Sequence, residues 1–266
     1  MPFTLVHPAA VVPLARGPLV VSALVAGAIA PDVLYLWPLN RLALELSGDF
    51  NATLTHSFPA VLWVGPLLTL AMLLAWYAVL RRPLLSLAPP SFAGRFAAPP
   101  SPRAWVSPRF LFWVLLSAAI GATTHVVWDA VTHGDLTVLR STEVAGMRVN
   151  RILQYISTVA GAAYLAWWVR RWWRRTTPGA VPDGLSGGAR RAAFAVLAVA
   201  AVAGAVVDLL TVGLPGLELT GEIEYPVRAV LAGASAGIAI GLAAYVIAWH
   251  GAGLLRRARA GEPASR

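Results

Sequence analysis

Six apolar stretches recur along this chain of 266 residues, each close to the roughly 20 residues that a helix needs to cross the hydrocarbon core of a bilayer. Only 12% of the residues are charged and the mean hydropathy is +0.68, whereas about 25% of the residues in a soluble domain are charged. The sequence therefore predicts an all-α, polytopic membrane helix bundle with about six transmembrane helices. The predicted spans are residues 18–37, 58–80, 110–131, 152–169, 192–214 and 227–249.

A shorter apolar segment, residues 3–14, precedes the first predicted span and contains His7. It is too short to cross a bilayer, so we expect an interfacial or re-entrant half-helix. If this segment folds back from a turn near Arg16, a rise of roughly 1.5 Å per residue puts His7 about 14 Å and Asp32 about 21 Å above that turn. With tilted helices, the two side chains can then approach each other.

Arginine is concentrated in alternate connecting segments, and this pattern predicts the orientation of the bundle. All 21 basic residues are Arg, and the formal net charge is +9. Because basic loops face the cytoplasm, we expect both termini there and residues 38–57, 132–151 and 215–226 outside. The use of Arg alone is typical of a GC-rich bacterial genome, so the expected location is a bacterial plasma membrane. The short basic clusters fit topology signals and lipid headgroup contacts, so nucleic acid is not an expected partner.

The same pattern predicts four parts along the chain. Residues 1–169 form a helical bundle that carries the polar motifs, and 170–191 form a basic cytoplasmic loop. Residues 192–250 form a C-terminal helical pair, and 251–266 form a basic tail. The Gly and Ala residues at 232–244 are typical of close helix packing.

Ionisable residues inside the predicted spans gather at one membrane depth. Such groups are costly in a membrane and usually face a cavity, a partner or a ligand. Since the chain has no Cys, any metal must be held by His, Asp or Glu. The residues at this depth are Asp32, His56, His125, Asp129 and His133.

His125, Asp129 and His133 follow one another at i, i+4 spacing, so their side chains lie along one helix face. Imidazoles and carboxylates together suit a divalent cation such as zinc, and two aspartates balance its charge. We therefore predict a metal site in which Asp32 and His56 from neighbouring helices join this face. His250 and Asp208 are expected to be packing residues, because His250 adjoins the basic tail and Asp208 has no neighbouring His.

Five sequence blocks occur in order along the first 161 residues: MPFTLVHPAAVVPL (1–14), GAIAPD (27–32), THSFP (55–59), GATTHVVWDAVTH (121–133) and LQYISTVAG (153–161). Together they resemble an uncharacterised bacterial membrane family, domain of unknown function 4184. This family is similar in turn to the YdjM-like membrane-bound metal-dependent hydrolases and, more remotely, to zinc-dependent phospholipase C.

The resemblance to phospholipase C implies roles for individual residues. One zinc site in those enzymes uses an Asp, a His and an H-x-x-x-D pair, which match Asp32, His56, and His125 with Asp129. In those enzymes an N-terminal His binds an adjacent metal, and His7 resembles it. His133 resembles a further His that follows the H-x-x-x-D pair. The downstream H-x-x-x-E pair and the N-terminal Trp ligand of those enzymes have no counterpart here, so the resemblance implies one or two metals.

The predicted function is a membrane-embedded metal-dependent hydrolase, with a phosphoester of a lipid or lipid-linked molecule as its substrate. The predicted metal ligands are His7, Asp32, His56, His125, Asp129 and His133, while Gln154 and Ser157 orient the substrate or a ligand. No residue is assigned as the general base. Two alternatives stay open: a non-enzymatic transporter or proton relay, and a structural membrane protein stabilised by a metal.

Overall fold

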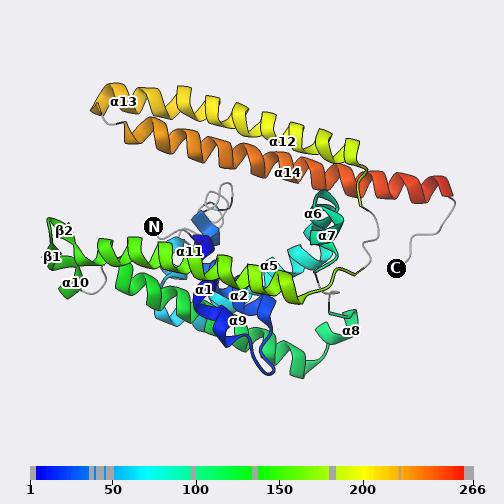
Figure 1. Cartoon of the computed structure of the whole chain (residues 1–266), viewed down its shortest axis with the longest axis horizontal. Helices are drawn as coiled ribbons and strands as arrows, with labels where there is room; N and C mark the ends of the chain where they lie inside the picture. Colours follow the sequence, from blue (N-terminus) through cyan, green and yellow to red (C-terminus); the bar gives the residue numbers. More distant parts are fainter. Residues whose placement is uncertain are drawn as a thin grey trace. The chain divides into compact units, whose positions relative to one another are not determined.

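The computed structural model describes residues 4–35, 39, 45, 51–96, 100–133, 137–179, 184–221 and 223–260. Most of these residues are helical (Figure 1). In the described part of the chain, the only strands are β1 (Glu143–Val144) and β2 (Met147–Arg148), which pair as an antiparallel hairpin. The predicted all-α class is therefore confirmed.

Five described helices are long and apolar enough to cross a membrane, and they overlap the predicted second to sixth spans. The chain is therefore a multi-pass membrane protein. The five helices are Val64–Leu87, Pro108–Thr132 (α9), Val149–Arg175 (α11), Gly187–Leu219 and Tyr225–Arg259, which lies within α14 (Glu224–Ala260). The first of them consists of α5 (Val64–Leu74), the π-helical η5 (Ala75–Leu80) and α6 (Arg81–Leu87). The fourth consists of α12 (Gly187–Asp208), the π-helical η6 (Leu209–Gly213) and most of α13 (Leu214–Thr220).

The predicted span 18–37 is shorter in the structure than expected. Its helical part is α2 (Val21–Ile29) followed by the 3-10 helix η3 (Ala30–Tyr35), and residues 36–38 lie outside the described residues. At about 1.5 Å per α-helical and 2.0 Å per 3-10 residue, this helix is roughly 25 Å long, less than the roughly 30 Å of a hydrocarbon core. Five of the six predicted spans are thus long apolar helices, and the described part of the first span is a shorter apolar helix.

The predicted N-terminal half-helix is present as three short turns, η1 (Thr4–Val6), α1 (Pro8–Val11) and η2 (Val12–Leu14). A turn at Gly17, which has a φ of +61°, reverses the chain, so that α1 packs against α2. Glycine adopts this left-handed conformation without a steric penalty. Both arms of the resulting hairpin contact α9.

The chain divides into two compact units, which we describe separately. Unit 1 comprises Met1–Tyr77 and Ala97–Thr177, and unit 2 comprises Ala78–Phe96 and Pro178–Arg266. Unit 1 also contains α4 (Ala52–Thr55), η4 (Phe58–Leu62), α8 (Pro102–Trp105) and α10 (Thr137–Ser141), and unit 2 contains α7 (Pro90–Ala93).

The core of unit 1 is the close crossing of α2 and α9. A Cβ atom on Gly27 would clash with the backbone of Ala118, and one on Gly121 would clash with the Leu24 carbonyl oxygen and lie 2.7 Å from the Ala28 nitrogen. At the other end of α2, the backbone N–H of Val20 donates to Ser117 Oγ over 2.9 Å. The small residues therefore let α2 lie directly against α9, which sets the position of Asp32.

Replacing Gly121 with alanine should lower the melting temperature of the detergent-purified protein. The new methyl group meets backbone atoms that cannot rotate away, and overpacking of this kind costs about 1–3 kcal/mol. Gly253→Ala is the matched control, because a Cβ there meets nothing within 4 Å and alanine favours a helix by up to about 1 kcal/mol over glycine. Equal melting temperatures for the two variants would contradict the close crossing.

Unit 2 is built on the close pairing of α12 and α14. Gly204 lies against Gly233, and Gly237 lies against the backbone of Ala200, so the small residues at 232–244 pack as predicted. The Tyr245 hydroxyl is 2.7 Å from Ser86 Oγ, which connects α14 to α6.

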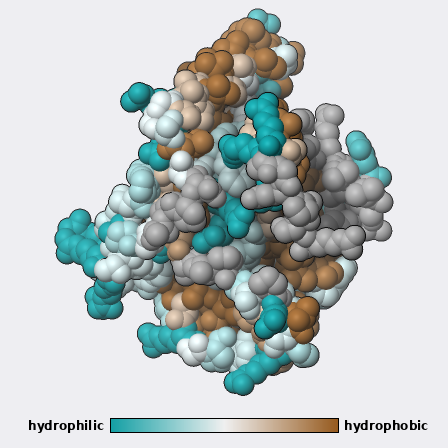
Figure 2. Space-filling model, turned by 90° about the vertical axis from the view of Figure 1, so that its right-hand side faces the viewer, coloured by the Kyte–Doolittle hydropathy of each residue, from teal (hydrophilic) through white to brown (hydrophobic). Residues whose placement is uncertain are grey.

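Many large apolar side chains of the protein are exposed, and Figure 2 shows such apolar surface in brown. A lipid environment accounts for this exposure.

Candidate metal centre

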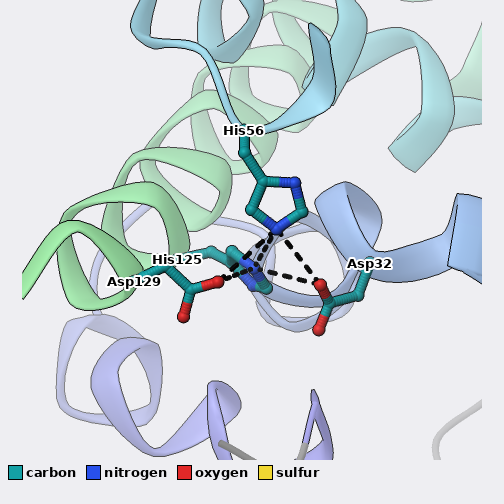
Figure 3. Close-up of side chains that lie close together, drawn as sticks. All are labelled: Asp32, His56, His125 and Asp129. Atoms are coloured by element: carbon teal, nitrogen blue, oxygen red, sulfur yellow. Dashed lines mark hydrogen bonds and ion pairs between the residues drawn. The ribbon is translucent and has the colours of Figure 1, made fainter. Parts of the chain in front are cut away.

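Four polar side chains from three separate segments of unit 1 converge on one point (Figure 3). His125 and Asp129 lie one turn apart on α9, Asp32 lies on η3, and His56 lies between α4 and η4. One ligand atom from each residue lies within 4.8 Å of the others. The structure therefore brings together four of the six predicted metal ligands.

Five of the six distances between these ligand atoms lie between 3.2 and 3.5 Å. His56 Nε2 lies 3.2 Å from Asp32 Oδ1 and 3.5 Å from Asp129 Oδ2. His125 Nε2 lies 3.5 Å from Asp32 Oδ1, 3.3 Å from Asp129 Oδ2 and 3.3 Å from His56 Nε2. A tetrahedral cation with ligand bonds of roughly 2.0–2.1 Å has its ligands about 3.3 Å apart. The five distances given above therefore fit a tetrahedral metal site.

The tautomer of His125 is set by the backbone of α2. Its Nδ1 lies 2.8 Å from the carbonyl oxygen of Ala28. A carbonyl oxygen only accepts hydrogen bonds, so Nδ1 carries the proton. Neutral His125 therefore presents the lone pair of Nε2 to the cluster.

The tautomer of His56 is set by a neighbouring hydroxyl group. Thr55 Oγ1 donates its proton to the carbonyl oxygen of Pro31 over 2.8 Å, and it lies 3.2 Å from His56 Nδ1. Since that proton is used, Oγ1 accepts from His56 Nδ1–H. His56, like His125, therefore presents an Nε2 lone pair to the cluster.

These assignments leave four electron-rich atoms facing one another. Two imidazole lone pairs and two carboxylate oxygens repel each other unless a cation lies between them. Asp32 Oδ1 is buried and has no hydrogen-bond partner, although a buried polar group normally has one. The negative charge of the two carboxylates and the unsatisfied Asp32 Oδ1 both fit a divalent cation held by four residues. These residues are Asp32, His56, His125 and Asp129.

The other two predicted ligands, His7 and His133, lie on the far side of Asp129. Asp129 Oδ1 is 3.5 Å from His7 Nε2 and 3.2 Å from His133 Nδ1. His7 is only 1% exposed, neither of its ring nitrogens has a hydrogen-bond partner, and its ring stacks on His125 at 3.8 Å. The expected approach of His7 to the site is thus present, and these two residues stay predicted ligands beside the four-residue group.

Gln154 and Ser157 lie next to this region on α11. Gln154 Nε2 is 3.3 Å from His133 Nε2, and Trp128 donates from Nε1 to Ser157 Oγ over 3.2 Å. Gln154 therefore contacts a predicted ligand directly. Ser157 contacts the site only through Trp128, whose ring centroid lies 5.4 Å from that of His7.

Two residues that support the site escaped the sequence analysis. Thr4 Oγ1 donates to Asp32 Oδ2 over 2.6 Å, which leaves Oδ1 free to face the cluster. Thr55 fixes the tautomer of His56, as described above. The T-H pair at 55–56 is a signal that could have identified Thr55, whereas Thr4 is 28 residues from its partner.

The two polar residues expected to serve packing lie in unit 2. His250 Nε2 is 2.9 Å from the carbonyl oxygen of Val79, so it has the hydrogen-bonded role that was predicted for it. Asp208 lies at the end of α12, in the same unit. The metal-site group in the described residues contains neither of them.

The hydrogen bond from Thr4 also bears on the predicted topology. It places the first described residue at the Asp32 end of the N-terminal hairpin, away from the Gly17 turn. An outward-facing site and a cytoplasmic location for Thr4 are therefore incompatible. The outward-facing orientation stays a prediction, which rests on the arginine-rich ends of the long helices.

Comparison with known proteins identifies a family but no activity. The model of the family described as domain of unknown function (DUF4184) matches residues 1–247. No curated protein and no solved structure matches the chain, so the similarity to YdjM-like hydrolases and phospholipase C stays a prediction. Because the match includes both the residues of the metal centre and most of the C-terminal helical pair, the protein belongs to the DUF4184 family.

Proposed function

We propose that the protein is a membrane-embedded, zinc-dependent hydrolase that cleaves a phosphoester in a lipid or lipid-linked substrate at the outer face of the membrane. The observation that carries this proposal is the convergence of two neutral imidazole nitrogens and two carboxylate oxygens within 4.8 Å of one another. This donor set suits zinc, and the two carboxylates balance its charge.

The four side chains of the metal centre differ in how much of their surface is exposed. His125 and Asp32 are 0% and 5% exposed and form its buried wall, whereas the side chains of His56 and Asp129 are 21% and 14% exposed. A substrate can thus approach from the His56 and Asp129 side. A zinc ion there would provide a water molecule that ionises near neutral pH and would polarise a phosphoryl oxygen.

Apolar side chains next to the centre favour an amphiphilic substrate. The ring of Tyr35 lies 5.7 Å from that of His56, and Tyr35 is 50% exposed. Phe58, two residues after His56, and Leu5, next to Thr4, are 58% and 59% exposed. A molecule with a polar head at the metal and an apolar tail against these residues is a lipid.

A structural metal site is the second candidate, because four protein ligands without an open position are typical of structural zinc. The exposure of His56 and Asp129 and the unsatisfied second oxygen of Asp129 favour catalysis instead. A proton relay has less support: the described parts of α2, α5 and α9 carry no His, Asp or Glu between the cluster and the Arg109 end.

The direct test is hydrolysis by the purified, zinc-loaded protein in detergent. We expect release of the headgroup or of phosphate from a phosphatidyl phosphodiester or a lipid phosphomonoester, with little turnover of water-soluble p-nitrophenyl phosphate. A chelator should abolish the reaction, and added zinc should restore it. Stoichiometric zinc binding without turnover of any of these phosphoesters would instead support the structural candidate.

A further inference from the structure

One end of unit 1 carries six arginines and no carboxylate. Arg170, Arg171, Arg174 and Arg175 close α11, while Arg109 opens α9 and Arg103 lies in α8. All six are exposed, and none of them makes an ion pair in the described part of the chain. The sequence has no Asp or Glu in residues 50–128 or 144–182. In the described residues, this positive charge is therefore not paired with a carboxylate of the unit.

The four arginines of α11 share one helix face. Their i, i+1, i+4 and i+5 spacing confines them to an arc of roughly 140° at 3.6 residues per turn. Trp167 lies on the same face, 53% exposed, and the Arg171 guanidinium lies 5.7 Å from the centroid of its ring. We call Trp167, Arg170, Arg171, Arg174 and Arg175 the Arg–Trp face.

The Arg–Trp face lies at the depth of a membrane surface. α11 is one of the helices long and apolar enough to span a bilayer, and exposed Trp side chains settle at the headgroup level. The arginines, which begin one turn after Trp167, are then level with lipid phosphates.

We propose that the Arg–Trp face binds the headgroups of anionic phospholipids. Guanidinium groups match phosphate oxygens with paired, charge-assisted hydrogen bonds, and basic clusters next to a transmembrane helix attract anionic lipid. A lipid is favoured over a soluble polyanion because the face begins at the apolar span itself. This proposal does not depend on the hydrolase activity.

The test uses the full-length protein in a neutral detergent, titrated with short-chain phosphatidylglycerol or phosphatidylcholine and followed by native mass spectrometry. We expect the protein to retain phosphatidylglycerol preferentially. Replacing Arg170, Arg171, Arg174 and Arg175 with glutamine should weaken this binding by about tenfold or more, since each basic residue contributes near an anionic surface. The matched control replaces Arg190, Arg191, Arg256 and Arg257 of unit 2 with glutamine and should retain the preference.

A second variant separates paired hydrogen bonding from charge alone. Lysine at the same four positions keeps the charge but loses the planar fork of arginine, so intermediate binding is expected. Circular dichroism checks that each variant stays folded. Equal retention of the two lipids, an equal loss in the unit 2 control, or equally tight binding of inorganic phosphate or a DNA oligonucleotide would each overturn the proposal.

Discussion

Replacing Asp129 with asparagine should nearly abolish zinc binding by the purified protein. Asp129 faces His56 and His125 with Oδ2, and it faces His7 and His133 with Oδ1. The substitution removes one of the two negative charges that balance the cation. Breaking a buried ionic group costs about 3–5 kcal/mol, which corresponds to a loss in affinity of roughly a hundredfold to several thousandfold.

Elemental analysis after dialysis and a competitive titration with a zinc chelator would measure this loss. Asp208→Asn is the matched control, because it makes the same change in an apolar helix of unit 2, outside the cluster. It should bind zinc like the unchanged protein. Equal zinc content in the two variants would contradict the assignment of the metal centre and, with it, the proposed activity.

Replacing His125 with alanine should reduce lipid phosphoester hydrolysis by at least about a hundredfold, beyond the 10–100-fold losses typical of groups that only support a ligand. His125 is fully buried, and its Nδ1–H is fixed by Ala28, so its Nε2 is an oriented ligand that alanine does not supply. Initial rates at saturating zinc, with phosphatidyl phosphodiester as substrate, would measure the change.

His250→Ala is the control for this experiment, because His250 bonds a backbone carbonyl in unit 2. It should retain the rate of the unchanged protein. If His125→Ala lost its zinc but kept the full rate, the reaction would not use this centre. If zinc content and rate were both unchanged, His125 would be a packing residue.

Much of the fold could be predicted because the membrane limits the choice of structure. In lipid, every backbone polar group must be satisfied within the segment, so long apolar stretches become helices. Five of the six predicted spans follow this rule. The described part of the stretch 18–37 is also helical, but it is shorter and changes from α2 to the 3-10 helix η3 at Ala30. Pro31, which lacks a backbone N–H, lies at this change.

The candidate site could be predicted only in part. The spacing of His125 and Asp129 fixes their common face on any helix, whatever the rest of the chain does. Asp32 and His56 had to be assigned by depth and by resemblance, and the structure brings both to that face. Thr4 could not be found in this way, because its hydrogen bond to Asp32 depends on the turn at Gly17 that folds the chain back.

The sequence by itself determined that this chain is a helical membrane protein, that its imidazoles and carboxylates gather at one depth, and that three of them share a helix face. These properties depend on hydrophobicity and helical period, which are local. Only the tertiary structure decided that four groups meet at ligand distances, and that Ala28 and Thr55 turn both Nε2 lone pairs inward. Those contacts join residues up to 97 positions apart, and they exist because small residues let α2 lie directly on α9.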